Sequence, residues 1–208
     1  MPDGKQKIAI INYGMGNLRS VQKAFERIGI QADIVSDPGH IQNASKIILP
    51  GVGHFGKGMK NLKESGLAEA IKEEVLLKRK PILGICLGMQ LLTNFSEEGN
   101  CEGLGLVDAE TVHFPSVSFG LKIPHMGWNE IKPVKESGLN VGIEKDCFMY
   151  FVHSYFVKCH QEIDVLFSAD YGITFDAGFE HENIIGVQFH PEKSHKTGLQ
   201  LLKNFITL

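Results

Sequence analysis

The chain has 208 residues, of which 43% are hydrophobic and 22% are charged. These proportions are close to those of average globular proteins, so they predict a substantial buried core and exclude disorder as the main state. The formal net charge is −3, from 21 basic and 24 acidic residues. Because neither sign forms a long run, we expect no nucleic-acid or membrane partner. Nothing is typical of a linker, and we expect one domain over residues 1–208.

No apolar run approaches the roughly 20 residues of a spanning helix. The amino-terminal stretch MPDGKQKIAIINYG lacks the apolar core and cleavage site of a signal peptide. These features predict a cytoplasmic protein. The four cysteines have no zinc-like or CxxC spacing, so we expect neither a metal nor a cofactor, and we interpret three of them, Cys101, Cys147 and Cys159, as structural.

The first half of the chain alternates short apolar runs with amphipathic stretches. The runs KIAIIN, QADIVS, KIILP and PILGIC predict strands, and KIILP and PILGIC are typical of central strands buried on both faces. Val21, Phe25 and Ile28 predict a helix that stops at Gly29, and a single long helical stretch is expected over residues 59–79. This alternation indicates an α/β fold with a doubly wound parallel sheet.

From about residue 104 the pattern changes to shorter pieces rich in β-branched and aromatic residues. Antiparallel strands are predicted at GLVDAETVHF, WNEIKPV, FMYFVHSYFVKC, DVLFSADYG, ITFDAGFE and NIIGVQF. The tail SHKTGLQLLKNFITL returns to a helical pattern, with Leu199, Leu202, Phe205 and Ile206 on one side.

Cys86 lies where the strand PILGIC gives way to the helical stretch LGMQLL, with Gly84 and Gly88 two residues before and after it. This is the nucleophile-elbow arrangement, in which small neighbours permit a sharp turn that exposes the nucleophile. The start of a helix also favours a thiolate, and the Leu87 N–H can stabilise an oxyanion. Most free cysteines are small buried hydrophobes, but the two glycines favour a nucleophile.

A cysteine nucleophile needs a base and a group that orients the base. His190 and Glu192 in FHPEKS provide both, and Pro191 makes the turn between them rigid. His153 in YFVHSYF also follows an apolar run, but no carboxylate accompanies it, so we interpret it as structural or as lining the substrate site.

Two glycine-rich stretches imitate nucleotide-binding motifs. GVGHFGKG at residues 51–58 lacks the Ser or Thr hydroxyl that a phosphate-binding loop uses for Mg²⁺, and GMGNLRS has Arg19 where a dinucleotide fingerprint has its third glycine. We interpret both as tight turns after strands. The first would lie beside Cys86 in a parallel sheet, where its backbone N–H groups can approach a ligand.

With GICLGMQ and QFHPEKS, the chain resembles the triad-type, or class I, glutamine amidotransferases, whose fold is a flavodoxin-like parallel sheet with an added antiparallel portion. NYGMGNL, LPGVGHFG, IPHMGWN and YFVHSYF resemble the glutaminase subunit of imidazole glycerol phosphate synthase. The resemblance covers almost the whole chain. It implies that Cys86 attacks the glutamine amide, that His190 moves the proton, and that Glu192 orients His190.

The resemblance also implies further site residues and a partner. Backbone N–H groups of Val52 and Leu87 would form the oxyanion hole, and the glutamine site would be lined by Gly51, Gly53, Gln90, Ser154 and Tyr155. The ammonia would pass to a (β/α)₈ cyclase subunit in histidine biosynthesis, giving a heterodimer. Asn12, Met126 and Trp128 are the candidates for the docking face, although a tryptophan is equally often packed in a core.

Other functions remain open. A paralogous glutaminase subunit could supply an amidine-forming synthase of bacterial surface-sugar biosynthesis, with the same triad. A stand-alone cysteine peptidase or γ-glutamyl hydrolase would need no partner, but Gln90 and the PGVGHFG loop argue against it. A regulatory module without catalysis is disfavoured because the Cys, His and Glu are all present.

Overall fold

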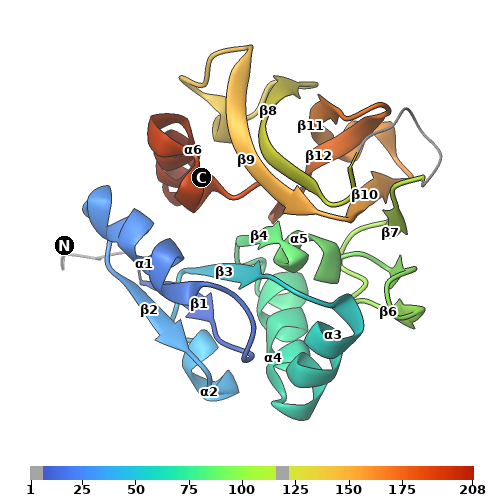
Figure 1. Ribbon diagram of the computed structural model, residues 1–208. Coiled ribbons are helices and arrows are strands. Elements are labelled where there is room, and N and C mark those ends of the chain that lie inside the picture. The colour runs from blue at the N-terminus through green and yellow to red at the C-terminus, as the bar shows by residue number, and fades with distance from the viewer. Residues whose placement is uncertain (1–6, 116–121) are drawn as a thin grey trace.

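The computed structural model describes residues 7–115 and 122–208. The segment considered above for a signal peptide lies partly outside these residues. Most strands join one sheet in the order β2-β1-β3-β4-β13-β12-β10-β7-β5-β6, which divides into a parallel and an antiparallel half (Figure 1). Within the described ranges, each helix is too short or too polar to cross a membrane.

The parallel half contains the four strands predicted from the first half of the sequence and one more. Its strands are β1 (Ile8–Ile11), β2 (Ala32–Val35), β3 (Lys46–Gly51), β4 (Ile82–Cys86) and β13 (Ile184–Val187). The prediction that NIIGVQF belongs to an antiparallel region was half wrong, because β13 pairs in parallel with β4 and antiparallel with β12. Its residues are buried throughout, as a central parallel strand requires.

Helices cover both faces of this parallel half. They are α1 (Leu18–Arg27), α2 (Pro38–Ile41), α3 (Phe55–Glu64), α4 (Leu67–Lys72), α5 (Leu87–Leu91) and α6 (His195–Thr207). Alternate residues of the strands enter two separate cores: α1 and α6 pack over one, and α2, α3 and α4 pack over the other (Figure 1). The predicted doubly wound architecture is confirmed.

The prediction of one helix over residues 59–79 was wrong. Helix α3 begins earlier, at Phe55, and ends at Glu64, and Gly66 then takes a left-handed conformation with φ 73° before α4 begins. A π-helical turn, η1 (Glu73–Leu77), follows α4. The apolar periodicity runs through this break because both helices pack on the same core, so periodicity did not show the interruption.

The remaining strands form the other half, in which every pairing among the described residues is antiparallel except that of β5 with β7. They are β5 (Phe95–Ser96), β6 (Cys101–Glu102), β7 (Ala109–His113), β8 (His125–Pro133), β9 (Cys147–His153), β10 (Tyr155–Cys159), β11 (Val165–Asp170) and β12 (Thr174–His181). FMYFVHSYFVKC, predicted as one strand, divides at Ser154, because β9 pairs with β8 whereas β10 pairs with β7 and β12. Short 3-10 turns complete it: η2 (Gly138–Asn140), η3 (Glu162–Asp164) and η4 (Pro191–Lys193).

Candidate active site

Cys86 is the last residue of β4, and α5 begins at Leu87. Its backbone has φ 54° and ψ −112°, a conformation that is strained for a residue with a side chain. The turn is possible because α5 lies directly against the sheet: a Cβ on Gly88 would lie 1.6 Å from the Leu49 carbonyl oxygen, and one on Gly84 would lie 2.7 Å from Met89 Cα. The two glycines therefore hold the predicted elbow through close packing.

The loop of residues 51–53 lies beside the elbow, because Gly51 pairs in register with Cys86. A cavity of about 310 Å³ opens between this loop and the turn from β9 to β10. It is lined by Val52, Gly53, Cys86, Leu87, Gln90, Glu98, Pro124, Val152, His153, Ser154 and Tyr155. Every predicted oxyanion and glutamine-site residue except Gly51 thus faces one cavity, and Gly51 lies buried next to it.

His190 and Glu192 lie in the turn after β13, the strand next to β4. His190 Nδ1 and Glu192 Oε1 are 2.9 Å apart, and the two side chains are only 3% and 2% exposed. Ser194 fixes this turn to β9, since its hydroxyl donates to the His190 carbonyl at 2.6 Å and accepts from the Tyr150 N–H at 3.0 Å. The sequence analysis assigned Ser194 no role, although it is the last residue of the motif FHPEKS.

The environment of His190 favours the imidazolium. Burial opposes its charge, but the negative charge of Cys86 and the bonded Glu192 carboxylate outweigh burial and raise the pKa of His190 to about 10. Nε2 of His190 has no formed hydrogen bond among the described residues. A cysteine and a buried imidazole that is oriented at Nδ1 and free at Nε2 can together carry out nucleophilic attack and proton transfer.

Two glutamines connect the elbow to the opposite wall. Gln90 Nε2 donates to the Tyr155 carbonyl at 2.9 Å and to Gln188 Oε1 at 3.0 Å, and Gln188 Nε2 lies 3.7 Å from Cys86 Sγ. Cys86 Sγ is also 3.8 Å from the Val152 carbonyl oxygen. Gln188 is fully buried. It begins the quoted motif QFHPEKS, but the sequence analysis assigned it no role because its position does not show that it reaches Cys86.

The sequence analysis missed two more polar groups. Glu98 brings a carboxylate into the cavity, and its Oε2 accepts from the Phe55 N–H at 2.6 Å. The Tyr13 hydroxyl packs against Gly51, where a Cβ would lie 2.2 Å from it. This hydroxyl is buried without a hydrogen-bond partner among the described residues, and burial followed by the nearby charge of Cys86 raises the pKa of Tyr13. Tyr13 lies in the quoted stretch NYGMGNL, which gave its side chain no role, and Glu98 lies in no quoted motif.

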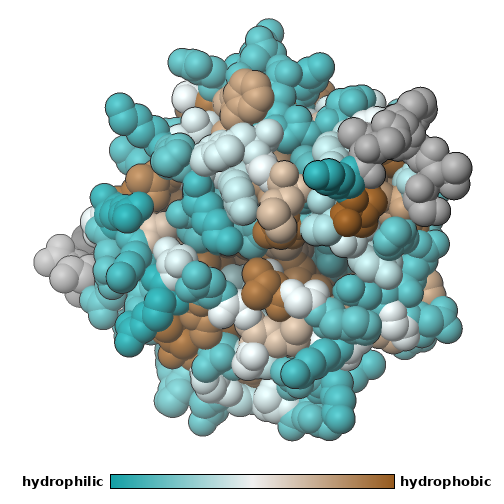
Figure 2. Space-filling model, in the orientation of Figure 1, coloured by the Kyte–Doolittle hydropathy of each residue, from teal (hydrophilic) through white to brown (hydrophobic). Residues whose placement is uncertain are grey.

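The three predicted docking residues differ in exposure. Met126 and Trp128 on β8 are 62% and 46% exposed, so the alternative that Trp128 packs in the core is wrong. Trp128 instead stacks on His195, with ring centroids 4.8 Å apart. Asn12 is half-buried, and its side chain bonds to Ser36 Oγ and the Gly14 N–H. Figure 2 shows a mostly hydrophilic surface on which apolar residues gather near the middle of the view.

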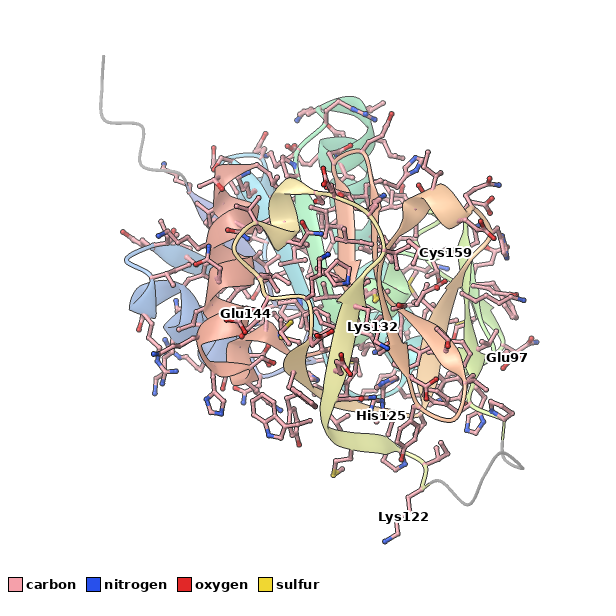
Figure 3. All side chains as sticks on the ribbon, turned by 90° about the horizontal axis from the view of Figure 1, so that it is seen from above. Glu97, Lys122, His125, Lys132, Glu144 and Cys159 are labelled. Atoms are coloured by element: carbon pink, nitrogen blue, oxygen red, sulfur yellow. The ribbon has the colours of Figure 1, made fainter. Side chains whose placement is uncertain are left out.

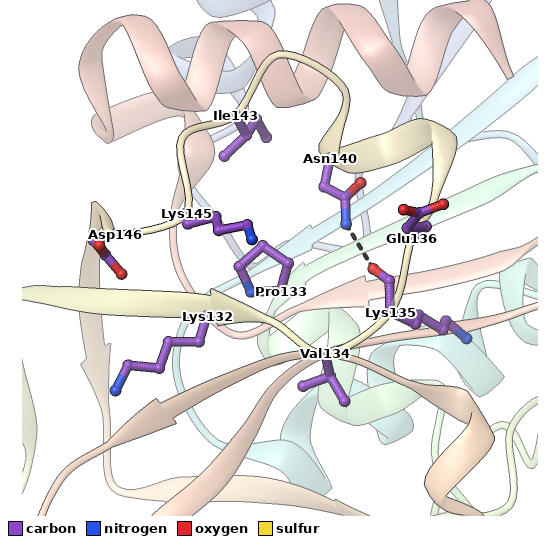
Figure 4. Close-up of a pocket in the computed structure, with 9 residues that line it drawn as sticks. All are labelled: Lys132, Pro133, Val134, Lys135, Glu136, Asn140, Ile143, Lys145 and Asp146. Atoms are coloured by element: carbon purple, nitrogen blue, oxygen red, sulfur yellow. Dashed lines mark hydrogen bonds between the residues drawn. The ribbon is translucent and has the colours of Figure 1, made fainter.

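A larger cavity, of about 470 Å³, lies along the end of β8 and the segment that leads to β9 (Figure 4). It is lined by Lys132, Pro133, Val134, Lys135, Glu136, Asn140, Ile143, Lys145 and Asp146. Lys135 is held by the Ile163 and Glu180 carbonyls, and Asn140 donates to the Lys135 carbonyl. These nine residues include neither a cysteine nor a histidine, and their charges are mixed, whereas the smaller cavity holds Cys86 beside a strained turn.

Comparison with known proteins places this fold and site in a class. The family model described as "Glutamine amidotransferase class-I" matches residues 9–208, and the chain belongs to this family. Two solved structures share the fold at 19% identity: "Crystal structure of glutamine amidotransferase", with a TM-score of 0.75 over 96% of this chain and 97% of the other, and "Structure of PurLQS from Thermotoga maritima", with 0.78 over 98% of each. The protein is therefore a glutamine amidotransferase.

More similar sequences narrow the comparison. The chain is 52% identical to "Imidazole glycerol phosphate synthase subunit HisH 1" of Campylobacter jejuni (strain RM1221), over 97% of this chain and 100% of the relative. It is 49% identical to "Imidazole glycerol phosphate synthase subunit HisH 2" of Methanococcus maripaludis, over 96% and 98%, and 45% identical to the HisH 2 subunit of Pseudomonas aeruginosa, over 97% and 99%.

Proposed function

We propose that the chain is the glutaminase subunit of an imidazole glycerol phosphate synthase. In the cytoplasm it hydrolyses glutamine to glutamate and ammonia and passes the ammonia to a (β/α)₈ cyclase subunit in histidine biosynthesis. The observation that carries this proposal is the 45 to 52% identity to HisH subunits over nearly the full length of both chains.

Cys86, His190 and Glu192 carry out the chemistry in this proposal. The Cys86 thiolate attacks the side-chain carbonyl carbon of glutamine, and the resulting oxyanion accepts hydrogen bonds from the Val52 and Leu87 N–H groups. His190 gives its proton to the leaving nitrogen, so the C–N bond breaks and ammonia departs. Its raised pKa supports this acid role. A glutamyl thioester remains on Cys86.

Hydrolysis of the thioester reverses these roles. His190, now neutral, takes a proton from water, and the hydroxide attacks the thioester carbon. The C–S bond breaks, glutamate leaves, and Cys86 and His190 regain their charges. Throughout, Glu192 holds Nδ1 of His190 at 2.9 Å, so that Nε2 carries the mobile proton.

The rest of the cavity recognises the α-amino acid end of glutamine. Glu98 provides the negative charge that an α-ammonium group requires, and backbone groups of Gly51, Gly53, Ser154 and Tyr155 bind the remaining polar atoms. Gln90 bonds to the Tyr155 carbonyl at 2.9 Å and holds that wall in place. The cavity of about 310 Å³ is large enough for one amino acid.

The partner docks at the exposed face of β8, which carries Met126 and Trp128, and at the adjoining loop ends. Met126 and Trp128 supply exposed apolar anchors there, and Asn12 lies at the end of β1, at the same carboxyl edge of the sheet as Cys86. Aromatic anchors of this kind are enriched among the residues that dominate binding energy.

A second candidate is a paralogous glutaminase that supplies an amidine-forming synthase of surface-sugar biosynthesis. It is favoured by the numerals in the names HisH 1 and HisH 2 of three similar proteins, which we interpret as distinguishing two copies. The triad and the cavity would serve either synthase equally well.

Ammonia release from glutamine tests both candidates. It is measured for the purified chain alone, with the (β/α)₈ cyclase of the same genome and its substrate analogue, and with a surface-sugar synthase. Strong stimulation by the cyclase supports the first candidate, whereas stimulation by the sugar synthase alone supports the second. Full activity without either partner would contradict both and favour a stand-alone hydrolase.

A further inference from the structure

Two buried histidines, His125 and His153, meet where β8 and β9 pair. They stand directly opposite each other in the strand register, with His125 Nδ1 and His153 Nε2 only 2.9 Å apart. His153 lines the Cys86 cavity, whereas His125 lies behind it. Figure 3 shows His125 at the start of β8, inside the fold, while the nearby Lys122 points away from it.

The direction of each hydrogen bond in this pair is determined by its neighbours. Asn129 Oδ1 accepts from the Glu130 N–H, so its Nδ2 is the donor to the Asp170 carbonyl and to His125 Nε2, which is 3.3 Å away. His125 must then carry its proton on Nδ1 and donate to His153 Nε2. His153 in turn carries its proton on Nδ1 and donates to the Tyr155 carbonyl at 2.8 Å.

Each ring nitrogen therefore either donates or accepts one hydrogen bond. Protonation of either ring would make two N–H donors face each other. Burial lowers the pKa of His125 to about 4 and that of His153 to about 3, so both rings are neutral at neutral pH. A neutral pair with fixed tautomers is a rigid connection between two strands.

One end of this connection is the glutamine site. The Tyr155 carbonyl accepts two hydrogen bonds, one from His153 Nδ1 and one from Gln90 Nε2. Through Gln188 the bonds continue to Cys86 Sγ. Residues 152–155, on both sides of His153, form one wall of the cavity. A shift of His153 therefore moves the groups that line the substrate pocket.

The other end is the exposed face of β8. Met126 follows His125 directly and Trp128 precedes Asn129, and both side chains are exposed. A partner that contacts Met126 and Trp128 would act on the backbone that carries His125 and Asn129. The connection thus runs from the docking face, which carries Met126 and Trp128, to the pocket wall at residues 152–155.

We propose that His125 is a positioning residue, which couples the β8 docking face to the glutamine-binding wall at residues 152–155 through its bond to His153. This inference rests on the proposed function and deepens it by naming the route between the partner and the substrate. His125 touches neither the substrate nor the reacting atoms in this account.

Two substitutions separate this role from simple packing. The His125 ring stacks on Phe151 and Tyr171, with centroid distances of 4.8 and 4.0 Å. His125→Phe keeps an aromatic ring there and removes the bond to His153. His125→Asn loses the ring but keeps a hydrogen-bond donor, because the asparagine amide nitrogen, like Nδ1 of histidine, is bonded to Cγ. Phe205→Leu, in the core beneath α6, is the control for a general loss of stability.

The experiment measures KM and kcat for glutamine hydrolysis, with and without the synthase that stimulates the wild type. We expect His125→Phe to raise KM roughly tenfold and kcat to change less than about threefold, because one buried hydrogen bond is lost. Stimulation by the synthase should fall in parallel. His125→Asn should stay within about threefold of the wild type, and Phe205→Leu should keep the wild-type KM.

A wild-type KM in folded His125→Phe, or an equal defect in His125→Asn, would overturn the inference, since packing alone would then explain the residue. If His125→Phe does not fold, Asn129→Ala removes the preceding bond and is judged by the same KM. Failure of the proposed function would give a different result: the wild type itself would release no ammonia from glutamine with any synthase.

Discussion

Four strands of the parallel half, β1, β3, β4 and β13, are buried on both faces, whereas β8 and β9 in the antiparallel half alternate between buried and more exposed residues. All residues of β3 and β4 are buried, but β8 shows Met126 and Trp128 to the solvent. Burial on both faces holds Cys86 without freedom to adjust, whereas Val52 and Gly53 in the adjoining loop are exposed. Burial on one face leaves the other face of β8 open to the solvent. The difference indicates that the nucleophile is built into the rigid half of the molecule, whereas the proposed control by a partner belongs to the other half.

The base stands at the junction of the two halves. Strand β13 pairs with β4 on one side and β12 on the other, and His190 follows it. The chemistry therefore requires both halves to be folded together. Substitutions in the parallel half should affect the reaction or the fold itself, and substitutions on β8 should affect mainly the coupling to a partner.

The largest expected effect is the loss of the nucleophile. Cys86→Ala should reduce glutamine hydrolysis by at least about a thousandfold, because no other thiol can form the thioester. Ammonia release with the synthase present measures it. Cys159→Ala in β10 of the antiparallel half is the control and should keep full activity. Comparable activity in Cys86→Ala would end the nucleophile assignment.

The same variant tests whether Cys86 raises the pKa of His190. Because the charge of Cys86 is the main factor that raises the pKa of His190, this pKa should fall in Cys86→Ala. The imidazole proton signal, followed by NMR against pH, reports it. An unchanged titration would mean that the two groups are not coupled.

A change of similar importance affects the elbow. Gly88→Ala should destabilise the fold by about 3 kcal/mol or more, since its Cβ would overlap the Leu49 carbonyl and nothing there can yield. Urea unfolding measures the free energy. Gly29→Ala is the control: its φ of 78° strains an alanine, but the space around it is open, so it should cost only about 1 kcal/mol. Equal costs would show that close packing is not what requires Gly88.

A smaller effect, on affinity for the synthase, is expected at the docking face of β8. Trp128→Ala should weaken binding to the synthase by about 2 kcal/mol, or roughly thirtyfold, through loss of an aromatic anchor. Titration calorimetry measures the affinity, and glutamine hydrolysis without the partner should stay unchanged. Ile163→Ala, another exposed apolar side chain, should bind normally. If the two variants bind alike, the docking face lies elsewhere.

A last effect appears only in acid. His125 and His153 have pKa values lowered to about 4 and about 3 in the folded protein, so below about pH 6.5 the unfolded chain takes up protons that the folded chain refuses. Their contribution is complete above pH 6.5 and declines as the pH falls toward 4, by about 1.4 kcal/mol per pH unit for each proton.

Urea unfolding between pH 7 and 5 measures this decline. His125→Phe should show a shallower decline than the wild type, by about one proton, and the core variant Phe205→Leu should keep the wild-type slope. Identical slopes in all three proteins would mean that the histidine pair does not titrate with folding.

Much of the parallel half could be predicted because its signals are local. Continuous apolar runs identified β3 and β4, and the glycines around Cys86 identified the strand-to-helix turn. The break at Gly66 and the division at Ser154 were missed. In both places the apolar pattern continues although the chain changes partners, and the pattern alone does not record which neighbour a strand or helix will contact.

The amino-acid sequence alone determined the element types, the position of the nucleophile and the short motif that contains the base, because each depends on residues only a few positions apart. The tertiary structure decided which distant residues meet: Gln188 reaches Gln90 and Cys86 across 98 and 102 positions, and His125 reaches His153 across 28. It also decided that Trp128 is exposed and that β13 joins the parallel sheet. Such contacts depend on how the sheet is ordered, and a local pattern carries no information about that order.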